Sequence, residues 1–264
     1  MENVNILYQF ALLTLLSIFS HWAAFKQQLF SFSKVSYQNI PYPITGAIFT
    51  ILTILFYLYP LPWFPWYLPF LLLLVYLGVK DKRLFICILK DRQTLPKSSI
   101  LWDILIGAAF FIVALPLLSL VQNGLEWIFT NIFNMEIPKQ HFIDFIKQIK
   151  EDKVSLVLFF AIICILVPIY EEYLYRANIQ TWLKNYFSPI WAIVITSSFF
   201  ALSHFFTIDT IQGKSVVLAS TFLASIYLGL AYERQRSLTS SITFHALVNT
   251  ITFLQVIFLT PTPS

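Results

Sequence analysis

Residues 154–176 read VSLVLFFAIICILVPIYEEYLYR, and this stretch decides how the chain must fold. It contains no charged residue before Glu171, so it is apolar enough and long enough to enter a bilayer as a helix. Crossing about 30 Å of hydrocarbon takes roughly 20 residues of helix. Glu171, Glu172 and Arg176 then follow within the same stretch. The stretch therefore predicts a membrane helix that carries ionisable side chains.

The composition of the whole chain is that of an integral membrane protein. Of its 264 residues, 58% are hydrophobic and 11% are charged, and the mean hydropathy is +0.74. A soluble domain carries about 25% charged residues, so this chain lacks the charge for a fully wet surface. The net charge of +4 forms no basic stripe, which argues against nucleic-acid binding. The predicted fold class is all-α, a polytopic membrane helix bundle.

Apolar runs along the chain predict about eight transmembrane helices in a single membrane domain, residues 1–264. Residues 1–153 would supply N-terminal helices and an interfacial segment, and residues 154–264 a catalytic core. The first run lacks a basic segment before it and a cleavage site after it, so we expect a retained span. The predicted spans are Ile6–Phe25, Ile44–Tyr59, Trp66–Val79, Ile100–Val121, the run from Val154, Ile190–Phe206, Val216–Tyr232 and Ser240–Leu259.

An amphipathic pattern occupies Pro138–Lys153, between two predicted spans. It predicts either a helix lying in the membrane interface or a peripheral packing helix. The apolar face holds Phe142, Phe145, Ile146 and Ile149, and Lys139, Lys147 and Lys150 lie off it.

Basic residues in loops predict the orientation of the chain. The Lys80–Lys97 loop holds six Lys and Arg residues, which favours a cytoplasmic position for this loop. With eight spans, both termini would then lie outside. The expected location is the plasma membrane of a prokaryote, as a multi-pass protein.

Three polar motifs interrupt the apolar runs. They are Glu171-Glu172-x-x-x-Arg176, Phe200-x-x-x-His204 and His245-x-x-x-Asn249. An ionisable side chain near the centre of a membrane helix costs roughly 2.5–3.5 kcal/mol on insertion scales. Each motif alone can be structural, as an ion pair, a packing histidine or an interhelical amide. Their joint occurrence on three helices predicts a functional site.

The first motif divides into a pair and a single acid. Glu172 and Arg176 are four residues apart and can pair on one helical face. Glu171 is rotated by about 100° from Glu172 and has no local partner on its helix. An unpaired carboxylate in an apolar bundle is a candidate general base. Glu172 and Arg176 are therefore expected to support the helix, while Glu171 performs chemistry.

The other two motifs supply the remaining parts of a hydrolytic site. His204 is one candidate partner for Glu171, and the two could hold and polarise a water. His245 and Asn249 are four residues apart and can both donate hydrogen bonds to a developing oxyanion. Ser203 adjoins His204 in sequence, but neighbours on a helix are expected to point apart, so a covalent nucleophile is not required. The predicted chemistry is hydrolysis by an activated water.

The three motifs together resemble those of the CPBP family, also called the CAAX protease or Abi family. The resemblance covers roughly residues 154–259 and implies an intramembrane glutamic endopeptidase of eight helices, similar to type II CAAX prenyl endopeptidases. By motif position, Glu171 and His204 would activate water, and His245 with Asn249 would form the oxyanion hole. Glu172, Arg176 and Phe200 would support the site. The family also includes bacteriocin self-immunity proteins and relatives that act as scaffolds.

The resemblance implies a membrane-anchored peptide or protein as substrate, the lipid bilayer as surroundings, and no cofactor or metal. The oligomeric state is not predicted. A zinc peptidase stays an alternative, because Glu171, His204 and His245 could ligate zinc, although no His-Glu-x-x-His motif is present. A non-catalytic scaffold or self-immunity protein and a transporter are further alternatives. Cys87 and Cys164 lie in apolar runs and are expected to be core residues.

Straight helices between the predicted ends would place Glu171 and His204 on opposite sides of the bilayer. For the two side chains to meet, the helix of Glu171 must extend beyond the membrane, or Pro168 must bend it.

Overall fold

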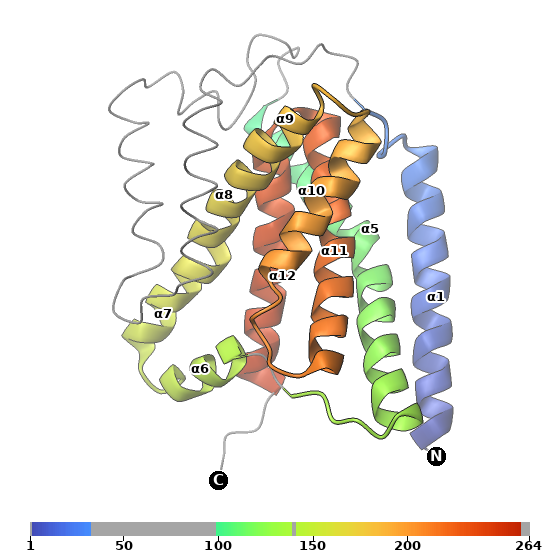
Figure 1. The fold of residues 1–264 in the computed structure, drawn as a ribbon, viewed down its shortest axis with the longest axis vertical. Helices are drawn as coiled ribbons and strands as arrows, with labels where there is room; N and C mark the ends of the chain where they lie inside the picture. The colour runs from blue at the N-terminus through green and yellow to red at the C-terminus, as the bar shows by residue number, and fades with distance from the viewer. Residues whose placement is uncertain (1, 33–98, 139–140, 260–264) are drawn as a thin grey trace.

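The computed structural model describes residues 2–32, 99–138 and 141–259, and within these ranges every regular element is a helix (Figure 1). Among the described residues, five helices are long and apolar enough to cross a membrane, and α10 is a shorter apolar helix. The predicted all-α polytopic bundle is therefore confirmed, and the chain is a multi-pass membrane protein. The predicted spans Ile44–Tyr59 and Trp66–Val79, the Lys80–Lys97 loop and Cys87 lie outside the described residues.

Each predicted span that falls within the described residues corresponds to a helix. Elements α7, η2, α8, η3 and α9 follow one another without a break and form one continuous span, Lys153–Leu183. The elements are α1 (Glu2–Lys26), α5 (Ile100–Trp127), η1 (Ile128–Ile132), α6 (His141–Ile149), α7 (Lys153–Ala161), η2 (Ile162–Leu166), α8 (Val167–Glu172), η3 (Tyr173–Gln180), α9 (Thr181–Leu183), α10 (Pro189–Ser203), α11 (Ile211–Gln235) and α12 (Leu238–Leu259), where η marks a π-helix.

Polar side chains at the helix starts satisfy backbone N–H groups that have no partner within the helix. Ser99 accepts from the Trp102 N–H at the start of α5, and Asp152 accepts from Val154 and Ser155 at the start of α7. At the other end of α11, Arg236 adopts a left-handed conformation with φ 50°, which closes the helix. These local signals set where the spans begin and end.

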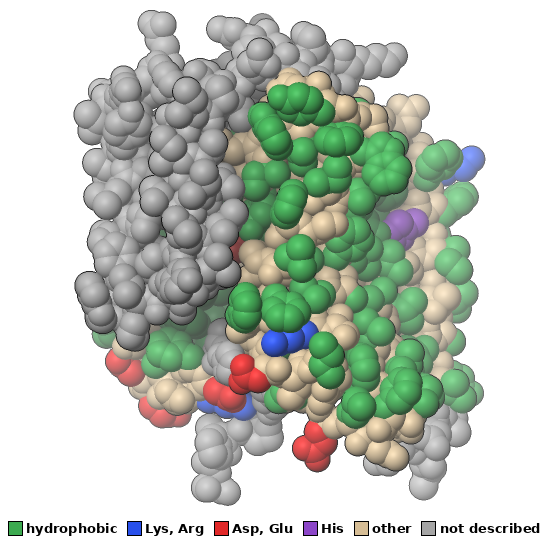
Figure 2. All heavy atoms as spheres, viewed as in Figure 1, with side chains coloured by type: hydrophobic (Ala, Val, Ile, Leu, Met, Phe, Trp, Pro, Cys, Tyr) green, Lys and Arg blue, Asp and Glu red, His purple; other side chains and the backbone are tan. Residues whose placement is uncertain are grey.

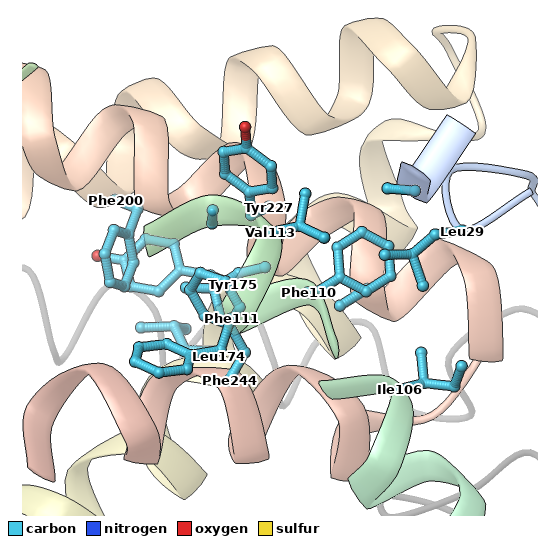
Figure 3. Packing of buried hydrophobic residues seen from close by; sticks show 14 residues of the cluster. Leu29, Ile106, Phe110, Phe111, Val113, Leu174, Tyr175, Phe200, Tyr227 and Phe244 are labelled. Atoms are coloured by element: carbon cyan, nitrogen blue, oxygen red, sulfur yellow. The ribbon is translucent and has the colours of Figure 1, made fainter. Parts of the chain in front are cut away.

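Helix α5 lies at the centre of the bundle and packs against α1, α11 and α12. The main core cluster contains Phe110, Phe111, Tyr227, Leu228 and Phe244, which α5, α11 and α12 contribute, and Figure 3 shows the rings of this cluster gathered between the helices.

A glycine permits the closest approach of α5 to α12. A Cβ added at Gly107 would lie 2.3 Å from the carbonyl oxygen of Ser240, closer than any side chain can come. In membranes, small residues at helix interfaces let backbones approach, because dispersion contacts drive association there.

The outer surface of the described helices is largely apolar. Figure 2 shows hydrophobic side chains spread over the visible face, with most of the visible acidic side chains near one end. Large side chains such as Phe25 and Phe258 are three-quarters exposed, at 75% and 76%. A soluble protein would not present so large an apolar area, so this surface is suited to lipid.

The amphipathic segment forms helix α6, which packs on the bundle. Ile146 is fully buried with Cys164, Phe253 and Val256 in a second cluster, and the ring of Phe145 lies 4.8 Å from that of Phe159. These direct contacts support the prediction of a peripheral packing helix. The buried Cys164 is a core residue, as expected.

The helices that carry the first two motifs differ in length. The helix Lys153–Leu183 has 31 residues and a length of about 46 Å, which exceeds the bilayer core. Helix α10 (Figure 1) has 15 residues and is only about 22 Å long, and His204 directly follows its last residue. Tyr175 of η3 and Phe200 of α10 meet, with their rings 5.0 Å apart.

Candidate active site

Glu171 and Glu172 lie at the end of α8, where both side chains are buried. Glu171 is 5% exposed and Glu172 is 0% exposed. The helix continues from Glu172 into the π-helix η3, whose wider turn carries Arg176. Such π segments inside α-helices occur frequently at functional sites. The arrangement buries three ionisable side chains within a span, so each needs compensation from its neighbours.

Glu172 and Arg176 form the predicted ion pair. Arg176 Nε lies 3.2 Å from Glu172 Oε2, and both side chains are fully buried. Arg176 Nη2 also donates to the carbonyl oxygen and the hydroxyl of Ser225 on α11, at 3.2 and 2.9 Å. The guanidinium carbon lies 5.0 Å from the centre of the Phe200 ring, a cation–π distance. The pair thus connects the motif helix to α10 and α11.

His245 on α12 lies between the two glutamates. Its Nδ1 is 3.0 Å from Glu172 Oε1, and its Nε2 is 3.5 Å from Glu171 Oε2. An ionised carboxylate only accepts hydrogen bonds, so Nδ1 carries the hydrogen and donates a hydrogen bond to Glu172. Glu172 therefore pairs with the Arg176 guanidinium and accepts a hydrogen bond from His245.

This geometry changes the expected pairing of Glu171. The imidazole beside its carboxylate belongs to His245, and no hydrogen bond or ion pair joins Glu171 to His204 in the described part of the chain. The reason is positional. His245 projects from α12 directly onto the end of α8, whereas His204 follows the last turn of the short α10.

His204 nevertheless lies beside the same phenyl ring as His245. The Phe200 ring centre is 4.9 Å from that of His204 and 5.8 Å from that of His245. His204 Nδ1 is 2.9 Å from the Phe200 carbonyl oxygen and 3.3 Å from the Ser203 hydroxyl, which leaves Nε2 as its outward atom. The structure therefore brings Phe200, His204 and His245 into one neighbourhood.

Asn249 is one turn beyond His245 on α12, and its amide faces the helix that carries the glutamates. Asn249 Nδ2 donates to the carbonyl oxygen of Ile163 at 2.9 Å. The side chain is half-buried. One amide hydrogen is thus used to hold a backbone carbonyl, and a second remains on the same nitrogen.

Two contributors to this site have no signal in the sequence motifs. Ser225 holds Arg176 from α11, and Tyr175 packs edge-on against Phe200. Ser225 is one of several small polar residues of α11, and the packing of α11 against η3 gives it Arg176 as a partner. Sequence spacing cannot reveal a contact 49 residues away.

A second buried polar group fixes the far end of the same helix. Glu233 on α11 accepts from Gln180 at 2.8 Å and from Lys184 at 2.6 Å, and Arg236 lies 3.4 Å from its other oxygen. Thr181 and Tyr232 add a contact of 3.1 Å between their hydroxyls. These contacts tie η3 and α9 to α11 and so hold the helix that presents Glu171.

The acids and imidazoles do not form a metal-binding constellation where the structure describes them. Across residues 2–32, 99–138 and 141–259, no three or more His, Cys, Asp or Glu side chains come together as metal ligands would.

A comparison with known protein families gives a match to part of the chain. Residues 153–251 match the family model described as Type II CAAX prenyl endopeptidase Rce1-like. The matched region spans the helices that carry all three motifs, and it covers fewer than half of the 264 residues. None of the curated proteins and none of the solved structures compared with the chain matches it. Residues 153–251 are therefore similar to the Rce1-like, type II CAAX prenyl endopeptidase family.

Proposed function

We propose that this protein is an intramembrane endopeptidase that hydrolyses a peptide bond of a membrane-associated protein or peptide. Water, activated by Glu171 with histidine, would be the nucleophile, and no metal would take part. The observation that carries the proposal is the position of His245, 3.5 Å from Glu171 and 3.0 Å from Glu172. It supports a base and a hydrogen-bond donor held side by side within a membrane helix bundle.

Glu171 is the proposed general base. Its separation from His245 Nε2 is too long for a strong hydrogen bond, so both atoms stay available to a third group. A water beside Glu171 Oε2 gives one proton to the carboxylate as its oxygen attacks the scissile carbonyl carbon. The carbonyl π electrons move onto oxygen and form the oxyanion.

His245 and Asn249 are the proposed donors to this oxyanion. The bond from His245 Nδ1 to Glu172 fixes the imidazole orientation, and Nε2 lies on the Glu171 side. Since Nδ1 already carries one hydrogen, Nε2 donates to the oxyanion in the imidazolium form of His245, whose charge the Glu172 carboxylate balances. Asn249 lies on the same face of α12 and keeps one amide hydrogen free of Ile163. Donors fixed before the reaction stabilise the developing charge without reorganisation.

His204 is the proposed proton carrier to the leaving group. Its ring lies against Phe200 on the side of α10, and its Nε2 points outward from its own helix. Collapse of the tetrahedral intermediate breaks the C–N bond and requires a proton on the leaving nitrogen. Glu171 holds the proton taken from water, and the His204 imidazole would carry it on to the leaving nitrogen.

The direct test is cleavage of a fluorogenic peptide anchored in nanodiscs by a lipid chain, with and without a prenyl group. The parent is expected to cleave it, and Glu171→Gln is expected to lose activity by at least about 10²-fold, since general acid–base catalysis contributes that much. Glu151→Gln is the matched control, because Glu151 is an exposed glutamate just before the same long helix.

The outcomes separate the proposed roles. Unchanged turnover by Glu171→Gln overturns the base assignment. Absence of cleavage by the folded parent on every anchored peptide favours a binding role, as a scaffold or self-immunity protein. A preference for the prenylated peptide identifies the substrate class.

A further inference from the structure

The turn before Pro168 leaves one backbone carbonyl without a donor from its own helix. In η2 the Val167 N–H donates to Ile162, five residues back, so hydrogen bonds here follow the π-helix pattern. The next donor in that pattern, toward Ile163, would come from Pro168. Proline has no N–H. The carbonyl of Ile163 is therefore free to accept from outside the helix.

Asn249 donates a hydrogen bond to this carbonyl. Its Nδ2 lies 2.9 Å from the Ile163 oxygen, across the contact between η2 and α12. One further contact lies beside this interface, where the rings of Phe160 on α7 and Phe253 on α12 lie 5.2 Å apart. A neighbouring side chain that satisfies a carbonyl freed by proline is what makes proline tolerable in a membrane helix.

We propose that Pro168 is a positioning residue for Asn249. By withholding a backbone donor, it reserves the Ile163 carbonyl for one amide hydrogen of Asn249. The other amide hydrogen is then held on the face of α12 that also presents His245, four residues earlier. Pro168 is fully buried and three residues before Glu171, so one residue governs both the shape of the base helix and the donor opposite it. The catalytic consequence of this inference rests on the proposed function. The structural coupling between Pro168 and Asn249 is independent of that function.

The variant Pro168→Ala supplies the missing N–H. Alanine in a helix interior is more favourable than proline, so this variant is expected to be at least as stable as the parent. Its new N–H competes with Asn249 for the Ile163 carbonyl. The expected result is a fall in kcat of about tenfold, the equivalent of one hydrogen bond, with KM little changed. If Pro168 had only a structural role, the Pro168→Ala variant would show a lower Tm or an unchanged kcat.

The double variant shows whether the effect passes through Asn249. Asn249→Ala lowers kcat in the parent, and adding Pro168→Ala is expected to lower it no further. A further fall in kcat in the Asn249→Ala background overturns the inference, because the proline would then act through the path of the helix itself. Pro116→Ala is the matched control, since Pro116 also lies inside a membrane helix but on α5.

Thermal unfolding tests the coupling without any activity. Asn249→Ala leaves the Ile163 carbonyl unsatisfied in the parent and is expected to lower Tm by about 2–4 °C. In the Pro168→Ala background the alanine N–H serves that carbonyl, so the same substitution is expected to lower Tm by less than half as much. Equal losses in both backgrounds overturn the inference. Failure of the proposed function looks different, because the parent then cleaves nothing while the Tm coupling persists.

Discussion

His245 Nδ1 donates to Glu172 Oε1 over 3.0 Å, so the second glutamate of the motif orients the imidazole that stands beside the first. Both side chains are buried, and Glu172 is completely so. The same carboxylate holds Arg176 through its other oxygen. The Glu172 carboxylate is thus the junction of three helical segments, and its loss would disturb stability and chemistry through separate partners.

The Glu172–Arg176 pair is expected to be strongly coupled. Glu172→Gln leaves a buried guanidinium without its counter-charge, and Arg176→Met leaves a buried carboxylate, so each is expected to lower the free energy of unfolding by about 3–5 kcal/mol. The double variant removes both charges and is expected to lose less than the sum of the two. Denaturation in mixed micelles, followed by tryptophan fluorescence, measures all three.

An exposed pair serves as the control for this cycle. Asp144 and Lys147 on α6 lie 3.4 Å apart, and the carboxylate is 57% exposed. Asp144→Asn is expected to change the free energy of unfolding by less than about 1 kcal/mol. Strict additivity of the Glu172 and Arg176 losses would show that the buried pair is not a unit.

Glu171 and His245 are expected to act together in catalysis. Because their facing atoms are 3.5 Å apart, each substitution removes one part of the same reacting arrangement. His245→Gln is expected to lower kcat/KM by at least about 10²-fold, and the Glu171→Gln/His245→Gln double variant to be little worse than either single. Initial rates on the anchored peptide decide this. Multiplying losses in the double variant would mean that the two residues serve independent steps.

The sequence predicts the membrane spans and the residues of the site better than it predicts which of these residues pair. Composition and the length of apolar runs fix α1, α5, α11 and α12, because a bilayer admits few alternatives to a helix of about 20 residues. The pair of Glu172 with Arg176 also follows from spacing, since side chains four apart share a helical face.

The partner of Glu171 depends on how helices dock, and local spacing holds no such information. His245 lies beside Glu171 although it is 74 positions further along the chain, and His204 packs against Phe200 with ring centres 4.9 Å apart. The contact of Asn249 with Ile163 likewise needs the π-turn before Pro168, a detail of backbone register. A sequence motif names the residues of such a site without giving their arrangement.

The two glycines of α5 are expected to respond differently to alanine. At Gly107 the new Cβ would lie 2.3 Å from the Ser240 carbonyl oxygen and 2.9 Å from Thr243 Cβ, so α5 and α12 must separate. Gly107→Ala is expected to lower the free energy of unfolding by about 1–3 kcal/mol, as overpacking does. At Gly124 nothing lies within 4 Å, so Gly124→Ala is expected to be neutral or stabilising. Equal effects on Tm at the two positions would contradict the close α5–α12 contact.

The start of the long helix is expected to weaken in acid. The pKa of Asp152 is lowered by hydrogen bonds from the Ser155 hydroxyl and backbone, and by that from the Val154 N–H. A carboxyl with a lowered folded pKa contributes stability above its unfolded pKa, and this contribution is lost as pH falls through the folded value. The Tm difference between the parent and Asp152→Ala is therefore expected to be largest near pH 7 and to shrink as pH falls through the lowered folded pKa of Asp152.

A cap that does not ionise is the control for this pH effect. Ser99 caps α5 through its hydroxyl, so the Tm difference caused by Ser99→Ala is expected to stay constant over the same pH range. An Asp152→Ala difference that is equally constant would show that the Asp152 carboxylate charge adds nothing to the cap.

Turnover is expected to survive removal of metal ions. A zinc peptidase would need Glu171, His204 and His245 around one ion, and in the described part of the chain no three His, Cys, Asp or Glu side chains come together in that way. Incubation of the purified protein with 1,10-phenanthroline, followed by dialysis, is expected to leave kcat/KM within about twofold of its starting value, a change of less than about 0.5 kcal/mol. A soluble zinc peptidase treated in parallel verifies that the chelator works. Loss of activity that one equivalent of Zn²⁺ restores would assign the water to a metal, and Glu171 would then be a ligand or its helper rather than the only base.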